Sequence, residues 1–252
     1  MPDEQPLVLE ERYGGVALIK LNRPERHHAL SRALSAALDA AIERAESDPD
    51  VRVVVLTGTG DRALCAGGDM LEMSGVEGRD EPAVGRGVDP YNRLSSTPLP
   101  VIAAINGYCY GGGARLAVAC DIRLASATAT FRLPGAEYGL VVAAATLPRL
   151  VGAAKAKELI FTARKFDAAE ALSIGLVNSV HEPSELLPAA MEMAATIAAH
   201  SAEAVRISKA VIDAATLSET AAQMEADANR RLRGSSEQTA RFREATTRVT
   251  GR

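Results

Sequence analysis

Two glycine-rich turns are the parts of this sequence best suited to chemistry on a bound ligand. One lies in "VVVLTGTGDRALCAGGDM" (residues 53–70) and the other in "PVIAAINGYCYGGGARLA" (residues 100–117), and each joins an apolar run to an expected helix. Backbone N–H groups without partners at a helix N-terminus carry partial positive charge and bind anionic oxygen. Glycine lets a ligand approach the backbone closely. Two such N–H groups from separate segments are what an oxyanion hole requires.

Two other interpretations of these turns stay open at the level of the residues. A glycine-rich helix start also permits close packing of a helix on a strand, with no ligand involved. A phosphate-binding loop is the weaker alternative. The stretch "GYCYGGGA" lacks the order G-x-G-x-x-G, and the chain contains no G-x-x-x-x-G-K-[ST].

The elements that must position these turns follow from the spacing of apolar residues. We expect a hairpin around residues 13–15, a helix that begins after Ser31 and ends at Asp48–Pro49, and buried strands over 51–58 and 100–106. Residues 121–134 predict two more short strands, and residues 75–90, rich in glycine, proline and charge, predict a mobile loop. Alternation of this kind is typical of an α/β core. From residue 143 on, the pattern predicts mainly helices, at 152–162, 168–174, 183–199 and from 203 to about 247.

Composition narrows the classes of partner and compartment. The chain has 252 residues and a net charge of −4, so neither nucleic acid nor an anionic membrane is an expected partner. Its three cysteines form no CxxC or Cys/His metal pattern, and such sparse cysteine use suits a reducing cytoplasm. The acidic, polar start of the sequence is not expected to be a signal peptide, and no apolar stretch reaches the roughly 18 residues of a membrane span.

Four longer motifs resemble one known family. They are "LNRPERHHAL", "CAGGDMLEM", "PVIAAINGYCYGGGARLAVACDIRLAS" and "FTARKFDAAEALSIGLVNSV", spread over nearly the whole chain. Through them the chain is similar to the crotonase superfamily, that is, the enoyl-CoA hydratase/isomerase family. The resemblance implies an α/β fold, a spiral of repeated β-β-α turns over residues 1–195, followed by a C-terminal helical trimerisation region over 196–252. It further implies a homotrimer or a dimer of trimers, and a CoA thioester as substrate or ligand with no other cofactor and no metal.

The same resemblance implies roles for individual residues. The N–H groups of the oxyanion hole fall at Gly68 and Gly112, where they would stabilise an enolate. Arg26, His27, Ala66 and Asp69 fall where the family contacts CoA, largely through backbone atoms, although Arg26 and His27 are also explained as ordinary solvated loop residues. Neither His27 nor His28, which stands where the family usually has Asn, is expected to be a catalytic base.

The sequence departs from the family where its hydratases carry two glutamates that handle water and protons. The resemblance places Arg115 at one of these positions and Gly135 at the other, in "FRLPGAEYGL". Arginine stays protonated and cannot act as a general base. Arg115 could bind a carboxylate on the acyl group, help to stabilise an enolate, or turn away and pair with an acid. In an extended segment Glu137 would share a face with residue 135 and could replace the lost carboxylate, or it could be a surface residue.

The expected function is therefore an acyl-CoA-thioester enzyme of the hydratase/isomerase type with atypical acid/base residues, a lyase or isomerase that is poor as a standard hydratase. The alternative is a non-catalytic acyl-CoA-binding protein that retains the oxyanion hole. A nucleotide-binding or scaffold protein has little support in the sequence.

Overall fold

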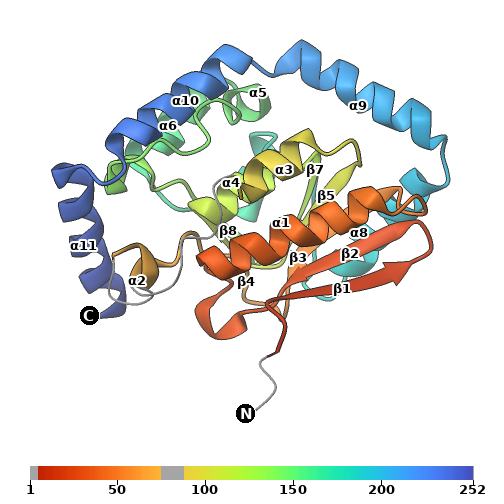
Figure 1. Cartoon of the computed structure of the whole chain (residues 1–252), viewed down its shortest axis with the longest axis horizontal. Helices are drawn as coiled ribbons and strands as arrows, with labels where there is room; N and C mark the ends of the chain where they lie inside the picture. Colours follow the sequence, from red (N-terminus) through yellow and green to blue (C-terminus); the bar gives the residue numbers. More distant parts are fainter. Residues whose placement is uncertain (1–4, 75–87, 252) are drawn as a thin grey trace.

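A computed structural model of the protein describes residues 5–74 and 88–251 (Figure 1). In these residues the strands form a six-stranded sheet, in the order β1-β2-β3-β5-β7-β10, and a four-stranded sheet, in the order β4-β6-β8-β9. The strands are β1 Val8–Tyr13, β2 Val16–Leu21, β3 Val53–Gly58, β4 Ala63–Cys65, β5 Val101–Ile105, β6 Tyr108–Tyr110, β7 Ile122–Ser126, β8 Thr130–Arg132, β9 Phe166–Asp167 and β10 Ser179–His181.

Helices follow the strand pairs, and the described chain after β10 is helical. No helix of the described ranges is both long and apolar enough to cross a bilayer. The helices are η1 Pro24–Arg26, α1 Arg32–Ser47, α2 Met70–Met73, α3 Pro90–Ser96, α4 Gly112–Ala119, η2 Ala136–Tyr138, α5 Pro148–Val151, α6 Ala153–Thr162, α7 Ala168–Ser173, α8 Leu186–Ala198, α9 Ala202–Thr216, α10 Glu219–Leu232 and α11 Ser236–Thr250.

The chain repeats one unit, which confirms the expected spiral of β-β-α turns. Strands β3, β5 and β7 lie in the large sheet, and the strand that follows each of them, β4, β6 or β8, lies in the small sheet. Helices come after β4 and β6, and the short η2 comes after β8. The neighbours β3–β5–β7 are parallel, whereas β1 and β2 form the expected antiparallel hairpin. Each turn of the spiral therefore brings a strand-to-helix connection to the same end of the molecule.

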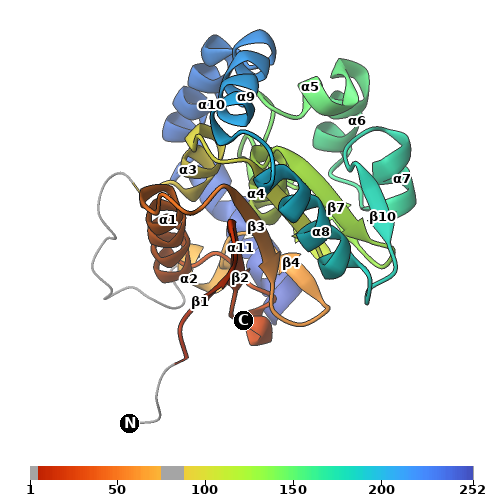
Figure 2. The ribbon, with the colours of Figure 1, turned by 90° about the vertical axis from the view of Figure 1, so that its right-hand side faces the viewer.

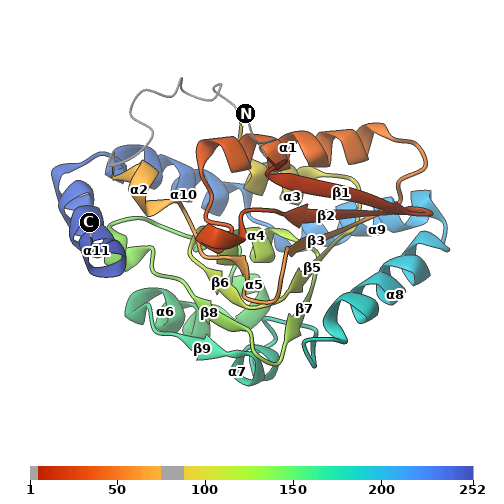
Figure 3. The ribbon, with the colours of Figure 1, turned by 90° about the horizontal axis from the view of Figure 1, so that it is seen from below.

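Residue alternation along the large sheet builds two apolar cores. Val54 and Leu56 of β3 face the larger core with α1, whereas Val53 and Val55 face the smaller one. Figures 2 and 3 show α1 and α8 on opposite faces of this sheet. Because both faces are covered, the central strands read as continuous apolar runs, as parallel strands do.

Local signals place most element boundaries as expected. Ser31 caps α1, and its Oγ accepts a hydrogen bond from the N–H of Leu34 at 3.1 Å. Asp48 follows the last residue of α1. The expected loop at 75–90 lies outside the described residues up to 87. Its last residues differ from the expectation, because Asp89 caps α3 through the N–H groups of Tyr91 and Asn92.

The expected long helical stretch from 203 to about 247 is three helices. Leu217 and Arg233 leave helical geometry and end α9 and α10, and Ser218 and Ser235 cap the helices that follow. Figure 1 shows α9, α10 and α11 in series along the outside of the molecule. The resulting bends bring α11 back to η2 and α2, near the glycine-rich turns.

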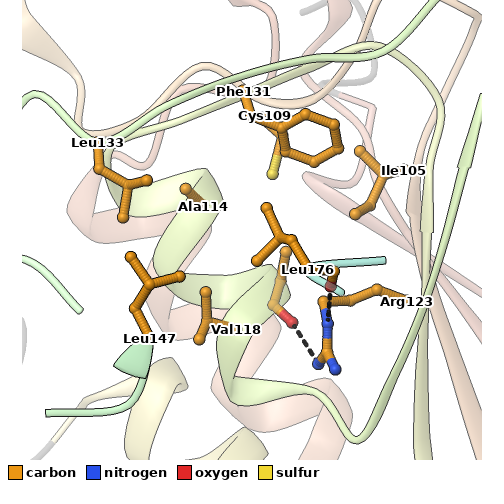
Figure 4. A pocket seen from close by; sticks show the side chains of 10 residues that line it. Ile105, Cys109, Ala114, Val118, Arg123, Phe131, Leu133, Leu147 and Leu176 are labelled. Carbon is orange, nitrogen blue, oxygen red and sulfur yellow. Dashed lines mark hydrogen bonds between the residues drawn. The ribbon is translucent and has the colours of Figure 1, made fainter. Parts of the chain in front are cut away.

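A small apolar void inside the core is too small to hold a ligand. Figure 4 shows it between Phe131, Leu147 and neighbouring apolar side chains, with Arg123 at its edge. Its volume is about 10 Å³, which is at most the space of one water. Arg123 is buried, and its guanidinium donates to the carbonyls of Leu176 and Cys120, both at 2.7 Å. It thus ties the end of α4 to the segment before β10.

Candidate active site

The two glycine-rich turns lie against each other. Their preceding strands, β4 and β6, pair in parallel, so the chain leaves both strands at the same edge of the small sheet. A Cβ atom on Gly67 would lie 3.6 Å from the nitrogen of Gly112, and one on Gly112 would lie 3.5 Å from the carbonyl carbon of Gly67. Gly67 has φ +112°, a conformation that favours glycine. The structure therefore brings together the two segments that the sequence singled out.

Each turn has, at a glycine that lines the cavity, a backbone N–H group that makes no hydrogen bond with any described residue. The backbone on both sides of Gly68 is hydrogen-bonded to Leu30: Gly67 O accepts from Leu30 N at 2.7 Å, and Asp69 N donates to Leu30 O at 3.0 Å. The N–H of Gly68, between these two bonds, has no partner among the described residues. Gly112 begins α4, where an N–H has no partner within the helix. Both glycines line the same cavity. Two such N–H groups at one cavity are what an oxyanion hole requires.

The cavity over these glycines has a volume of about 1160 Å³, large enough for a sizeable organic ligand. Its walls come from the two turns, from α2 and α3, from the segment 134–142 and from the last two helices. The C-terminal helices expected for assembly thus also enclose this site. The sequence-predicted residues that line the cavity are Arg26, His27, Ala66, Gly68, Asp69, Gly112 and Arg115.

Two of the residues predicted to contact CoA have structural partners as well. Asp69 accepts hydrogen bonds from the N–H groups of Leu71 and Glu72 at the start of α2, and its carboxylate lies 2.5 Å from Arg23 Nη1. The ring of His27 packs edge-on against Tyr108, with 5.6 Å between centroids. Its buried Nδ1 has no hydrogen-bond partner among the described residues.

His28 has a structural role away from the cavity. It is buried; its Nδ1 accepts from Arg23 N at 2.9 Å, and its Nε2 lies 3.0 Å from Thr59 O. Since a carbonyl only accepts, Nε2 carries the proton of a neutral ring. Burial lowers the pKa of His28, so the ring stays neutral near pH 7.

Arg115 points its charge at an aromatic ring beside the paired glycines. Its Cζ lies 4.2 Å from the centroid of Tyr91, which is a cation–π distance. Tyr91 belongs to α3, and its hydroxyl oxygen lies 2.7 Å from where a Cβ of Gly112 would be. Burial raises the pKa of Tyr91 strongly, so the hydroxyl stays protonated. Sequence reasoning missed Tyr91, because residues 75–90 were expected to form a loop and no helix was expected directly after it.

Comparisons with known proteins identify the family of this chain. The family model described as Enoyl-CoA hydratase/isomerase matches residues 11–250. The chain belongs to the enoyl-CoA hydratase/isomerase family. A short-chain-enoyl-CoA hydratase of Clostridium acetobutylicum is 42% identical over 212 residues, which cover 82% of this chain and 80% of the relative. A crotonyl-CoA hydratase of Syntrophomonas wolfei is 37% identical over 209 residues, which cover 81% and 80%.

Solved structures of the same family share the fold. The crystal structure of a carnitinyl-CoA hydratase from Mycobacterium avium superposes with a TM-score of 0.85 at 30% identity, covering 96% of this chain and 97% of that one. A monofunctional enoyl CoA isomerase from M. smegmatis gives a TM-score of 0.72 at 33% identity, covering 86% and 98%. The family thus includes relatives named for different reactions, and membership alone does not choose among them.

Glu137 does not lie where an extended segment would have placed it. Residues Ala136–Tyr138 form the 3₁₀ helix η2, so the expectation that residues 135 and 137 share one face of an extended strand is wrong. The carboxylate of Glu137 instead forms ion pairs with Arg132 and Arg248, and Glu137 is not among the cavity-lining residues. A catalytic role for Glu137 stays a prediction without support from its position.

The position of Gly135 leaves little room for a side chain. Gly135 lines the cavity, but a Cβ there would lie 2.8 Å from Val142 Cγ2 and 2.9 Å from Leu140 O. Such approaches require the loop to shift. That Arg115 and Gly135 replace the two glutamates of related hydratases stays a prediction from the resemblance.

The carboxylates that line the described part of the cavity all have partners in the protein. Asp69 and Asp89 cap α2 and α3, and Glu72 accepts from the N–H of Arg32 and pairs with its guanidinium at 3.0 Å. Across residues 5–74 and 88–251, no three His, Cys, Asp or Glu side chains gather as a metal site would need. Among the carboxylates of the described cavity wall, none is therefore left without a protein partner.

Helix α10 holds the loop that forms one wall of the cavity. The buried carboxylate of Glu225 accepts from the N–H groups of Ala143 at 3.0 Å and Ala145 at 2.8 Å. One turn further, Asn229 accepts from Val141 N and donates to Val141 O. Ala143 has φ +58°, which a non-glycine residue adopts at a cost. Sequence reasoning missed Glu225 and Asn229, because an i,i+4 polar pair on a helix normally indicates a solvated face.

Proposed function

We propose that the protein is an acyl-CoA-thioester enzyme that stabilises an enolate with the N–H groups of Gly68 and Gly112. The observation that carries the proposal is that these two N–H groups have no described partner and line one cavity. The thioester oxygen would lie between the two donors, and Arg26, His27, Ala66 and Asp69 would contact CoA at the adjacent rim. Such donors act when negative charge moves onto that oxygen. The relatives named as hydratases of enoyl thioesters support this class of ligand.

Proton transfer would use groups other than the usual two glutamates. Burial raises the pKa of Tyr91, so its hydroxyl stays protonated and donates a hydrogen bond rather than taking a proton near pH 7. An arginine side chain has N–H donors and no acceptor, so Arg115 offers no base either. We therefore expect weak hydration of crotonyl-CoA. Acid–base assistance contributes roughly 10²–10⁴-fold, so the rate should be at least about 10³-fold below that of a competent hydratase. The same observation favours the alternative, a non-catalytic acyl-CoA-binding protein.

Binding tests the ligand class first. Medium-chain acyl-CoA should bind with a dissociation constant of about 1 μM or lower, near −8 kcal/mol, and free CoA should bind more weakly. Isothermal titration calorimetry measures both. No binding of any acyl-CoA below millimolar concentration would remove the enzyme and the alternative together.

Turnover then separates the enzyme from the non-catalytic protein. Loss of enoyl absorbance would follow hydration of crotonyl-CoA, and chromatography would follow conversion of a wider panel of enoyl- and malonyl-type thioesters. Glu137→Gln should leave any turnover within a few-fold, because Glu137 is held by Arg132 and Arg248 outside the cavity lining. Fast hydration that Glu137→Gln abolishes would restore Glu137 as the base, and no turnover of any thioester would favour the alternative.

We further propose a homotrimer or a dimer of trimers. Helix α9 has no buried residue, and its exposed side chains include Ile207, Val211 and Ile212. Ion pairs join it to the rest of the described chain: Lys209 pairs with Asp121 at 2.8 Å, and Arg149 pairs with Asp213 at 3.1 Å. An apolar helix face of this kind is typical of a surface covered in an oligomer.

A further inference from the structure

The cavity wall beside Gly112 carries a positive charge that no described acid neutralises. Arg115 lines the cavity, and its side chain makes no hydrogen bond or ion pair with any described residue. The carboxylates of Asp69, Glu72 and Asp89, which line the same cavity, are taken up by helix caps and by Arg23 and Arg32. Charged groups that are partly withdrawn from water are normally paired. No acidic side chain in the described cavity wall therefore pairs with Arg115.

The contact with Tyr91 orients this charge without using its hydrogen-bond donors. The guanidinium carbon of Arg115 lies over the ring of Tyr91, with 4.2 Å from Cζ to the centroid. The N–H groups of the guanidinium make no hydrogen bond with a described residue, and a guanidinium that stacks on a ring keeps them available for a planar anion. The fork of donors matches a carboxylate, which it can bind through two parallel hydrogen bonds.

The place of Arg115 on α4 indicates which part of a ligand it meets. Residues 112 and 115 are three apart on the same helix, so they lie one above the other on one side of it. A thioester whose oxygen binds the N–H of Gly112 would run its acyl chain past Arg115. The 3′- and 5′-phosphates of CoA lie at the other end of the ligand, beyond the long pantetheine arm.

We infer that Arg115 binds a carboxylate on the acyl chain, so that the preferred thioesters are those of dicarboxylic acids. This inference rests on the proposed function and adds the substrate class of the same site. Tyr91 positions the guanidinium, and the two glycines bind the thioester oxygen. The site then recognises both ends of a short acyl group: one as an oxyanion, the other as a carboxylate.

Three saturated thioesters of equal acyl length test the inference without turnover. Glutaryl-CoA carries the terminal carboxylate, its methyl ester removes the charge, and pentanoyl-CoA lacks the group. By calorimetry, wild type should bind glutaryl-CoA about tenfold or more tightly than either of the others, equivalent to about 1.4 kcal/mol. Equal affinities for the three would overturn the inference but leave the proposed function intact. No binding of any of them would overturn both.

Variants then assign the preference to Arg115. Arg115→Met should remove the advantage of glutaryl-CoA and leave pentanoyl-CoA within about twofold of wild type, whereas Arg115→Lys, which keeps a point charge, should retain part of it. Arg231→Met is the matched control, because Arg231 is exposed on α10 and does not line the cavity.

Two outcomes of the variant series count against the inference. If Arg115→Met weakens all three ligands equally, Arg115 binds a part of CoA common to them. If Arg115→Met leaves the preference for glutaryl-CoA unchanged, another group binds the carboxylate. Circular dichroism checks that each variant folds. Should Arg115→Met not fold, the wild-type comparison of glutaryl-CoA with its methyl ester still tests whether the cavity prefers a carboxylate, because the ester removes the charge and adds only a methyl group, and Arg115→Lys then tests the residue.

Discussion

At the scale of single residues, adjacent glycines of the central turn have different roles. A Cβ on Gly113 would lie 2.0 Å from the backbone oxygen of Cys65, whereas a Cβ on Gly112 would meet the side chains of Tyr91 and Leu30 at 2.7 and 3.1 Å. Gly113 thus permits the close approach of α4 to β4. Gly112 instead leaves room for the side chains of Tyr91 and Leu30 beside the cavity.

Alanine substitutions should separate these two roles. Gly113→Ala should lower the free energy of unfolding by roughly 1–3 kcal/mol, because backbone atoms have to move. Gly112→Ala should cost less stability, because a side chain can move, but it should weaken acyl-CoA binding or turnover roughly tenfold or more through displacement of Tyr91. Urea denaturation and calorimetry check the two effects. Equal losses of stability with unchanged ligand affinity in Gly112→Ala would show that Gly112 is also a packing glycine.

His28 should make stability depend on pH. Its pKa is lowered by burial, so in acid the unfolded state binds a proton that the folded state resists. The free energy of unfolding should therefore be fully retained above about pH 6.5, the ordinary pKa of histidine, and fall as the pH drops below it.

The variant His28→Asn provides the comparison for this titration. Asparagine tolerates the φ of +54° at this position and retains a hydrogen-bonding side chain that does not titrate. Urea denaturation between pH 5 and pH 8 should give a shallower slope for the variant than for wild type. Parallel slopes would mean that His28 titrates alike in both states.

At the scale of elements, α10 supports the cavity through the loop that it binds. Glu225→Ala would leave the N–H groups of Ala143 and Ala145 without their carboxylate partner, at a cost of roughly 1–3 kcal/mol in the free energy of unfolding. Glu225→Gln is the matched variant, because its amide oxygen still accepts one of the two hydrogen bonds.

Hydrogen exchange locates the effect of these changes. Amides over 141–147 should exchange faster in Glu225→Ala than in Glu225→Gln, while those of β3 and β5 should stay protected. If the loop stayed as protected as in wild type, the loop would hold its conformation without α10.

At the scale of the whole molecule, the exposed face of α9 should decide assembly. We expect wild type to elute as a trimer or hexamer in size-exclusion chromatography with light scattering. The double change Ile207→Glu and Val211→Glu should shift it toward monomer, because two charges cannot be buried without partners. Thr196→Glu with Ala195→Glu on α8 adds the same two charges to exposed sites of another helix and serves as control. A monomeric wild type at micromolar concentration would contradict the prediction.

Much of the framework could be predicted because its signals are local. Apolar runs predicted β3 and β5, Ser31 predicted the start of α1, and the glycine-rich turns indicated where backbone donors could meet a ligand. The assignment of those donors to Gly68 and Gly112 came from the family resemblance and stays a prediction. These features depend on the conformational preferences of a few consecutive residues. The spiral arrangement was predicted from the family resemblance, because the spacing of apolar residues indicates elements but not how they are arranged. The boundary between regions 1–195 and 196–252 stays a prediction, as does a cytoplasmic location.

Tertiary structure decided the features that depend on distant partners. The bends after α9 and α10 bring α11 back against η2 and α2, so a region expected to serve assembly also closes the cavity. Glu137 looked like a candidate base in the sequence, but a 3₁₀ turn, the nearby Arg132 and the distant Arg248 determine where its charge lies. Tyr91 and Arg115 are 24 positions apart in the sequence, and only packing of α3 on α4 stacks one on the other. Backbone preferences act over a few residues and can be read along the chain, whereas charge pairing and desolvation are set by whichever side chains the fold brings into contact.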